Sequence, residues 1–394
     1  MKAYRALFIA ALSAACVSCL HDPSAYEGGT PSVTSASSTA DFGTVYPVDG
    51  GKQICNPSVS SDTVNYPASM LWLNFSGSLS VKDAPVGYTT SGVAEHDRLT
   101  VSDTAGKVLW FVLRDSVPGA ECQFQDPEWS ASPDYIVALG GRVAKGAKSC
   151  DDAIDYGILA FRMSDKNKKP YWFYKDSISE LATPHLWVGS ASAAVDSSDS
   201  LGTFFGTDSV KLVYVSEDDN VIFVDFANGG KRVTLPRPSG RSGWMMDSPL
   251  ISPDGKWITY NILEDSFTWE SYIQELAANS TPVKIPTDST TSLEPVQPHW
   301  WQFGSRLFVV WAEFPSGNAW LNKADLTNAS AQDGSVGRTC MREVKLTAGA
   351  PMDIAVEWVG AVREIASVPF TGGRSPDGHF LATGTNNGYL LMLP

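Results

Sequence analysis

The stretch that decides the fold is Pro-Leu-Ile-Ser-Pro-Asp-Gly-Lys-Trp-Ile-Thr-Tyr, residues 249–260. Its Ser-Pro-Asp-Gly centre is typical of a tight turn, because Pro253 fixes its own φ and Gly255 tolerates a positive φ. The residues that follow, 256–260, mix β-branched and aromatic side chains. Such a mixture after a turn predicts the second strand of a hairpin.

The same turn occurs again near the end of the chain, at residues 375–378, and a weaker copy lies within residues 129–138. The turn residues of the two sharp copies are Ser252, Pro253, Asp254, Gly255, Ser375, Pro376, Asp377 and Gly378. A hairpin that recurs along a chain predicts a repeat protein.

A second hairpin accompanies the first in each repeat, as at residues 221–226 and 232–235 on either side of Asn-Gly-Gly. We expect six such outer hairpins, which begin near residues 99, 157, 221, 272, 319 and 388. Each follows an inner hairpin, which begins near residue 67, 127, 184, 249, 298 or 373. Four short strands repeated six times predict an all-β fold, a six-bladed β-propeller with four-stranded antiparallel blades.

The last predicted blade lacks its outer strand, because the chain ends at residue 394. A strand from the N-terminal side, within residues 44–48, could fill that place. We therefore predict that an N-terminal strand closes the ring, which leaves few unpaired strand edges.

These repeats resemble those of the TolB-type six-bladed propellers of the periplasm, over roughly residues 60–394. The Ser-Pro-Asp-Gly turns and the strand pair at residues 221–235 carry the resemblance. The resemblance implies a propeller and a place in the cell envelope. This chain has a tether where TolB carries a separate N-terminal α/β domain, and it lacks the hydrolase domain found beside such propellers in dipeptidyl-peptidase relatives.

The first 19 residues are predicted to be an export signal, since Lys2 and Arg5 precede an apolar segment at residues 6–15. The cysteines that follow resemble a bacterial lipoprotein signal, with Cys19 as the expected lipid attachment site and Cys16 as the alternative. Ordinary secretion with cleavage near Ala15 remains a further alternative. Residues 20–42 are rich in Ser, Thr, Gly and Pro and predict a flexible tether, and residues 43–394 form the propeller.

The formal net charge of −14 argues against nucleic acid or an anionic lipid surface as a partner. No apolar run of about 18 residues follows the export signal, so we expect membrane contact through a lipid anchor only.

Four cysteines lie beyond the signal, which favours disulfides in an exported protein. Cys122 and Cys150 flank the inner hairpin of the second blade and are predicted to pair. Cys55 and Cys340 would then pair with each other. The histidines are scattered, and the four cysteines beyond the signal lack the spacing of two to four residues that metal ligands have, so we predict no metal.

The sequence contains no G-x-S-x-G, P-loop or H-E-x-x-H signature, which predicts no catalytic residue and no cofactor. The alternative is a carbohydrate-active enzyme, which would need two carboxyl groups at the mouth of the channel. Asp247 and Glu294 precede inner strands and are the first candidates for such a pair.

Thirteen tryptophans are the one compositional excess of the chain. Trp129, Trp257, Trp300 and Trp301 lie on predicted strands, where aromatic rings fill the wedge between blades.

A second group lies in or beside predicted loops, and all of its members fall on the face where the connections between blades emerge. It comprises Trp244, Met245, Met246 and Trp269. A large apolar side chain in a loop needs a reason, and carbohydrate stacking, a peptide or protein partner and packing under the loop all fit. Because they share one face of the propeller, these residues are the candidate partner-binding face. The sequence thus predicts an exported, lipid-anchored protein, facing the periplasm or the cell surface, whose propeller is a non-catalytic binding or scaffold module for an envelope protein or glycan.

Overall fold

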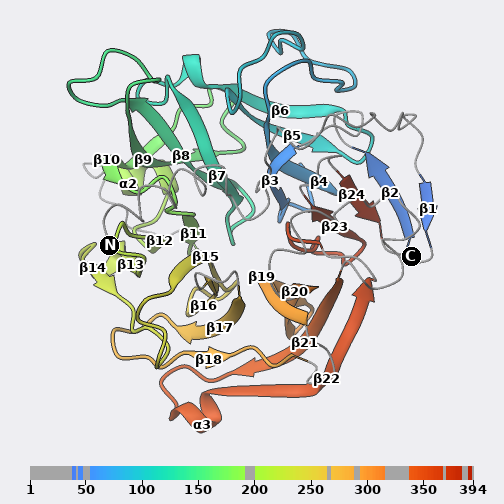
Figure 1. Cartoon of the computed structure of the whole chain (residues 1–394), viewed down its shortest axis with the longest axis vertical. Coiled ribbons are helices and arrows are strands. Elements are labelled where there is room, and N and C mark those ends of the chain that lie inside the picture. Colours follow the sequence, from blue (N-terminus) through green and yellow to red (C-terminus); the bar gives the residue numbers. More distant parts are fainter. Residues whose placement is uncertain are drawn as a thin grey trace.

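The computed structural model describes residues 38–40, 43–47, 54–190, 200–263, 268–287, 293–315, 337–366, 370–383 and 389–392, and every structural statement below concerns these residues. Their strands form four-stranded antiparallel sheets arranged around a common centre (Figure 1). This arrangement is an all-β propeller, which confirms the predicted fold class. The predicted residues 1–19 and most of the tether lie outside the described residues.

Five blades each consist of four strands that are consecutive in the chain, with the first strand nearest the centre (Figure 1). The blades are β3 (Ile54–Val59), β4 (Ser69–Asn74), β5 (Arg98–Asp103) and β6 (Val108–Leu113); β7 (Gln123–Trp129), β8 (Tyr135–Val143), β9 (Ile154–Arg162) and β10 (Tyr171–Ile178); β11 (His185–Val188), β12 (Val210–Val215), β13 (Val221–Asp225) and β14 (Arg232–Thr234); β15 (Met245–Ile251), β16 (Trp257–Leu263), β17 (Trp269–Glu275) and β18 (Val283–Lys284); and β19 (Leu293–Phe303), β20 (Arg306–Pro315), β21 (Arg338–Leu346) and β22 (Val356–Ala366).

A further sheet takes strands from both ends of the chain, in the order β1 (Ser38–Ala40), β2 (Gly43–Pro47), β24 (Tyr389–Met392), β23 (Phe380–Thr383). The count of blades built from consecutive strands is thus five, not the predicted six, because this sheet has no four successive strands of its own. β2 pairs with β24 from Thr44 opposite Met392 to Pro47 opposite Tyr389. β1 lies inside the range predicted to be tether, and it pairs with β2.

The middle strands of the blades are buried on both faces, because each sheet is covered by a neighbouring sheet on either side. Every residue of β4 and of β16 is buried. The hydrophobic core therefore lies between the blades: for example, Val213 and Phe223 of one blade pack with Ile258 and Tyr260 of the next.

The two sharp Ser-Pro-Asp-Gly turns have the same hydrogen bonds. The Ser252 hydroxyl donates to Asp254 Oδ1 (2.5 Å) and accepts from the Trp257 N–H (3.0 Å). The Ser375 hydroxyl donates to Asp377 Oδ1 (2.6 Å) and accepts from the Phe380 N–H (2.9 Å). In each turn the serine side chain therefore replaces a backbone partner, which explains why the first residue is serine.

The blade of β19–β22 differs from its predicted strand order. Residues 319–326, expected to form its third strand, lie outside the described residues. The third strand is β21, and the fourth is β22, for which the sequence predicted no strand. The sequence concealed β22 because most of its residues are partly or fully exposed, as on an outer edge strand, so its apolar pattern is weak.

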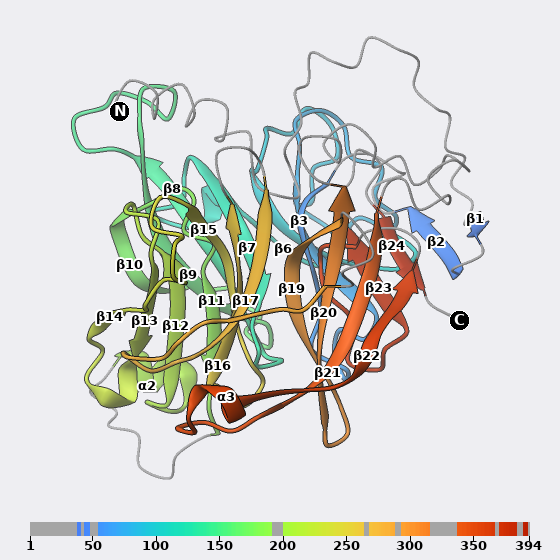
Figure 2. The ribbon, with the colours of Figure 1, turned by 60° about the horizontal axis from the view of Figure 1, so that its bottom comes forward.

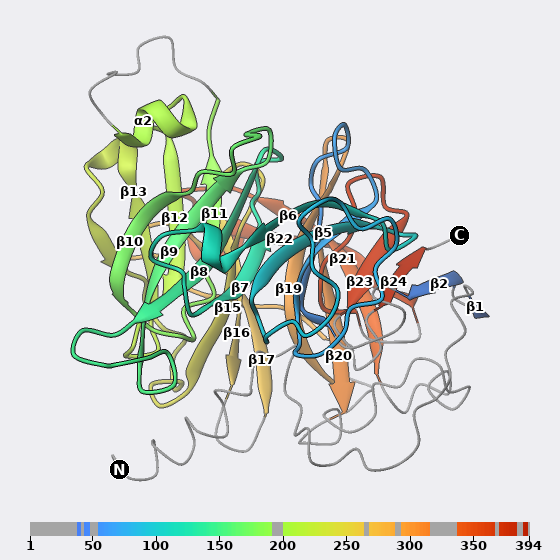
Figure 3. The same ribbon diagram turned by 90° about the horizontal axis from the view of Figure 1, so that it is seen from above.

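Two short helices lie at the periphery of the propeller. α3 (Met352–Ala355) precedes β22 at the rim (Figure 2). α2 (Ser200–Phe205) connects β11 to β12 and lies at one end of its blade (Figure 3). Phe205 of α2 packs against Tyr135 and Tyr171 of the preceding blade, so the helix covers an aromatic cluster rather than the channel.

Cys122 and Cys150 form a disulfide, as the sequence predicted, with their Cα atoms 5.4 Å apart. The predicted pairing of Cys55 with Cys340 is wrong, because Cys340 is a free thiol. Cys340 is fully buried in β21 within the core between two blades, and burial raises its thiol pKa. The side chain of Cys55 lies outside the described residues, as do Cys16 and Cys19.

Candidate functional site

The inner strands of four blades are interrupted at the same place by a β-bulge. The register against the second strand shifts between Cys55 and Ser58, Gln125 and Glu128, Asp247 and Leu250, and Val296 and His299. A bulge re-aims side chains and is common beside functional sites.

A polar residue followed by proline occupies each bulge, and the same pair precedes β11. The polar residues have positive φ: Asn56 (45°), Asp126 (43°), Thr183 (39°), Ser248 (48°) and Gln297 (51°). Non-glycine residues rarely adopt this conformation, which costs about 1–3 kcal/mol per residue and occurs preferentially at functional sites. Five residues held in this way at equivalent positions make the surrounding region the candidate site.

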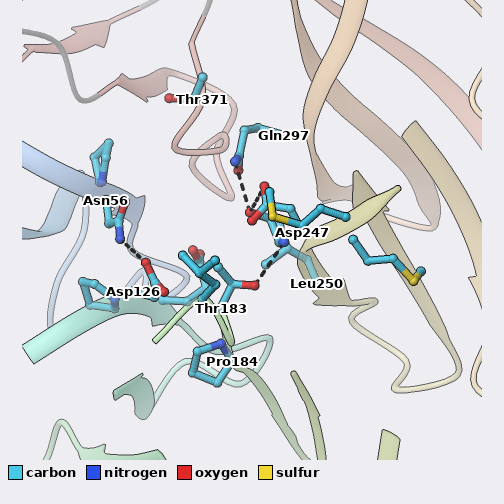
Figure 4. Close-up of a pocket in the computed structure, with 15 residues that line it drawn as sticks. Asn56, Asp126, Thr183, Pro184, Asp247, Leu250, Gln297 and Thr371 are labelled. Carbon is cyan, nitrogen blue, oxygen red and sulfur yellow. Dashed lines mark hydrogen bonds between the residues drawn. The ribbon is translucent and has the colours of Figure 1, made fainter. Parts of the chain in front are cut away.

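The five polar residues line one cavity at the end of the channel where the inner strands begin (Figure 4). The cavity measures about 730 Å³, including the part open to solvent. Its other lining residues are Pro57, Pro127, Glu128, Leu181, Pro184, Met245, Met246, Asp247, Leu250 and Thr371. The connections between blades emerge at this end, which is the face where the sequence predicted binding.

Hydrogen bonds link the lining residues from one inner strand to the next (Figure 4). On one side, Asn56 Nδ2 donates to Asp126 Oδ1 (2.6 Å). On the other, the Ser248 N–H donates to Thr183 Oγ1 (3.1 Å), and Gln297 Nε2 donates to Ser248 Oγ (3.1 Å). These bonds fix the polar side chains before any ligand arrives, which reduces the entropy cost of binding.

Carboxyl groups dominate the electrostatics of the cavity. Asp247 is 7% exposed and accepts a hydrogen bond from the Ser248 hydroxyl (3.0 Å). Burial raises the pKa of Asp247 to about 6. Burial also raises the pKa of Glu128 to about 8, although the Ser58 hydroxyl donates to Glu128 Oε1 (2.5 Å). At neutral pH the Asp247 carboxyl is mostly charged and the Glu128 carboxyl mostly neutral.

A second cavity of about 720 Å³ lies at the opposite end of the channel, beside the Ser-Pro-Asp-Gly turns. It shares Glu128 and Leu250 with the first cavity. His185 and His299 line it, and burial lowers the pKa of His185 to about 3 and that of His299 to about 4. Both imidazoles are therefore neutral at physiological pH, and His185 Nδ1 accepts the Ile251 N–H (2.9 Å).

The predicted binding residues divide between the cavity and the core. Met245 and Met246 line the cavity, although Met246 is only 1% exposed and also packs in the core between two blades. Trp244 is partly buried, with the Arg241 guanidinium 4.3 Å from its ring centre. Trp269 is only 2% exposed and packs with Leu263 and Phe314. The prediction that Trp269 lies on a binding face is therefore wrong, because β17 begins at this residue and directs its ring between two sheets.

The predicted carboxyl pair is also divided. Asp247 lines the cavity, but Glu294 does not; its Oε2 accepts the Trp269 N–H (2.8 Å). Asp126 and Glu128, which the sequence analysis did not single out, lie in the cavity instead. The signal that could have found the site is a polar residue followed by proline, at or before the start of five of the six predicted inner hairpins: Asn56-Pro57, Asp126-Pro127, Thr183-Pro184, Ser248-Pro249 and Gln297-Pro298.

The described parts of the chain bring no three His, Cys, Asp or Glu side chains together in a group that could hold a metal ion. None of the helices in those parts has the length and hydrophobicity that a membrane crossing requires.

No protein family matches the sequence, and no curated protein matches it either. Among solved structures, the chain is similar to an Agrobacterium tumefaciens protein assigned as TolB, with a TM-score of 0.41 and 12% identity, over 89% of this chain and 97% of that one. It is similar to AofleA from Arthrobotrys oligospora, with a TM-score of 0.42 and 11% identity, over 89% and 87%. It is also similar to an α-L-arabinofuranosidase from Lactobacillus brevis, with a TM-score of 0.36 and 11% identity, over 77% and 92%. What these proteins bind or hydrolyse is not transferred to this chain.

Proposed function

We propose that this protein is a non-catalytic binding module of the cell envelope, which holds a segment of a protein or glycan partner in the cavity at the channel mouth. The ring of polar side chains on strained bulges is the observation that supports this proposal. Polar groups that converge on a cavity are typical of ligand sites, and a rigid closed scaffold holds them in place.

The shape of the ring supports the same proposal. We infer that the sheet of β1, β2, β24 and β23 serves as a sixth blade, since Leu381 of β23 packs with Trp301 and Phe308 of the neighbouring blade. On its other side Ala382 packs with Met70 and Trp72. A ring that is closed on both sides keeps the lining residues at fixed positions around the channel.

The proposed location is the membrane surface, where a lipid on Cys19 would anchor the protein, with Cys16 as the alternative attachment site. Labelled palmitate should enter the full-length protein, and replacement of both cysteines by alanine should abolish the labelling. Labelling that survives the double replacement would remove the lipoprotein proposal without affecting the binding site.

The binding proposal is tested by introducing an arginine at each end of the channel in turn. Met245→Arg places a long side chain at the rim of the candidate cavity, and Gln302→Arg places the same charge beside the opposite cavity. The affinity-tagged protein is crosslinked in its own envelope and the captured material is identified by mass spectrometry. Met245→Arg should lose the partner and Gln302→Arg should retain it. Equal capture by both variants would contradict the proposal.

A carbohydrate-active enzyme is the second candidate, because Asp126, Glu128 and Asp247 line one cavity. Glu128, whose pKa is raised to about 8, would be protonated at neutral pH as a general acid must be. A panel of aryl glycosides tests this candidate. Hydrolysis that is lost in Glu128→Gln would establish catalysis, and the binding-only proposal would then be wrong.

A further inference from the structure

The candidate cavity offers more hydrogen-bond acceptors than donors. Asp126, Glu128 and Asp247 contribute carboxyl groups, and none of the described residues that line the cavity is Lys or Arg. Asp247 receives hydrogen bonds from uncharged groups, the hydroxyl of Ser248 and the amide of Asn261 (3.5 Å). A buried carboxylate without a cation beside it favours a positively charged ligand.

A second observation points to a ligand independently of the carboxyl groups. Thr371 is 8% exposed, and its Oγ1 has no hydrogen-bond partner among the described residues. Thr371 lines the same cavity, where Figure 4 places it across from Asp126 and near Gln297. Buried hydroxyls are nearly always hydrogen-bonded, so this one is suited to a partner that the ligand brings.

The walls of the cavity are apolar beside these acceptors. Met245, Met246 and Leu250 line it on the β15 side, and Leu181 lies before β11. Such walls suit the methylene groups of an alkyl chain, while the polar groups suit its charged end. Lysine combines a four-carbon stem with an ammonium group, and it buries the stem along apolar surface.

We propose that the cavity binds a lysine side chain of the partner protein, with its ammonium group at Asp247 and Thr371 and its methylene groups along Met245 and Met246. The inference rests on the proposed function and names the chemistry of the inserted group. The acceptors come from separate elements around the channel, an arrangement that suits the three diverging donors of an ammonium rather than the planar fork of arginine. The net charge of −14 would attract such a partner from a distance.

The test measures binding of Nα-acetyl-lysine methylamide to the full chain by NMR titration at pH 7.5. The matched probe is Nα-acetyl-norleucine methylamide, which has the stem without the ammonium. The lysine probe should bind at least tenfold more tightly. Asp247→Asn should remove most of that difference and Thr371→Val should reduce it, whereas Asp208→Asn, at an exposed site, should not change it. Equal affinity for the two probes would overturn the inference.

Two further measurements distinguish a failure of the lysine inference from a failure of the proposed function. D-glucosamine and N-acetylglucosamine test an amino sugar; binding of glucosamine without binding of the lysine probe would overturn the lysine assignment in favour of a glycan. The melting temperature of each variant shows whether it has folded. If no probe binds but Met245→Arg still abolishes partner capture, the lysine inference fails and the proposed function stands. If Met245→Arg leaves capture unchanged, the proposed function fails as well.

Discussion

The indole N–H of Trp187 in β11 donates a hydrogen bond to the main-chain carbonyl of Pro253, in the Ser-Pro-Asp-Gly turn of the next blade, at 2.9 Å. The relationship recurs between Trp301 in β19 and Pro376 in the next sheet, at 3.3 Å. A tryptophan of one sheet thus covers the turn of its neighbour. The turn that identifies the repeat in the sequence is therefore also a contact between repeats.

The Trp187 contact explains why the turn ends in glycine and gives the first prediction. Gly255 has φ +69°, and a Cβ added there would lie 2.5 Å from the Trp187 ring. Gly255→Ala should therefore lower the free energy of unfolding by more than about 2 kcal/mol, through backbone strain and overpacking. Gly240→Ala is the control, with φ +77° but open space around its Cβ. In urea unfolding, the control should lose about 1 kcal/mol of the free energy of unfolding. Equal losses for the two variants would contradict the close contact between Gly255 and Trp187.

The two tryptophans of the predicted binding face should behave differently. Trp269 is 2% exposed in a cluster of five fully packed side chains, so Trp269→Ala should cost about 3–5 kcal/mol of stability. Trp244 is partly buried, and Trp244→Ala should cost less, because part of its ring is already in water. Thermal unfolding of both variants checks this order. A larger loss for Trp244→Ala would show that the packing around β17 is misassigned.

The disulfide between Cys122 and Cys150 closes a separation of 28 residues. Its removal should cost about 3–4 kcal/mol, because the unfolded chain gains the freedom that the crosslink withheld. The variant with both cysteines replaced by serine should unfold at lower urea than the wild type. Reductant should lower the urea midpoint of the wild type to that of the variant. It should leave the urea midpoint of the variant unchanged. A reductant effect on the variant would point to a second disulfide.

The carboxyl of Glu128, a partly buried residue of β7, makes stability depend on pH. Its pKa is raised in the folded state from 4.5 to about 8, so folding favours the protonated form. The stabilisation is complete below the unfolded pKa and is lost as the pH rises towards the folded pKa. Between pH 6.5 and 8 the contribution of Glu128 to the free energy of unfolding should fall by about 1–2 kcal/mol.

Glu128→Gln should remove this fall in the free energy of unfolding. Glutamine stays neutral at every pH and can still accept a hydrogen bond from the Ser58 hydroxyl. Glu217→Gln, at an exposed position, should keep this fall. Asp247 titrates at lower pH, with a pKa of about 6. His185 and His299, whose folded pKa values are about 3 and 4, bind protons near pH 6.5 only in the unfolded state, so they raise the free energy of unfolding over the same range. The Glu128 effect is therefore measured as the difference between the wild type and Glu128→Gln. Equal pH dependence of the wild type and Glu128→Gln would place the Glu128 carboxyl in water.

The sequence predicts what depends on local chemistry. The turns at Gly255 and Gly378 need a positive φ, and the middle strands are continuous apolar runs, so both were found. The spacing of Cys122 and Cys150 about one hairpin was sufficient to pair them. The strand at Gly43–Pro47 was predicted because a final blade without an outer strand needs one.

What depends on neighbouring sheets was not predictable in the same way. Trp269 was assigned to a loop because strand ends are poorly marked in sequence, and only the packing of the next blade buries it. Cys340 was paired by elimination, although it is buried in β21 among apolar side chains with the Glu313 carboxylate beside its thiol. The site was missed because Asn56, Asp126 and Gln297 converge only when the ring closes, and each is an ordinary polar residue before a proline by itself.

The pairing of Thr44 with Met392 has a consequence for how the protein reaches its native state. A chain made from its N-terminus presents β1 and β2 first and β24 last, so β2 can pair with β1 at once but has no partner on its other edge until synthesis is almost complete. The five blades of consecutive strands require only short-range pairing, whereas the joining of β2 to β24 spans nearly the whole chain, and long-range pairing is slow. Assembly of the channel is thus a late event, and the acidic cavity would acquire its lining from Thr371 only after every other wall is in place.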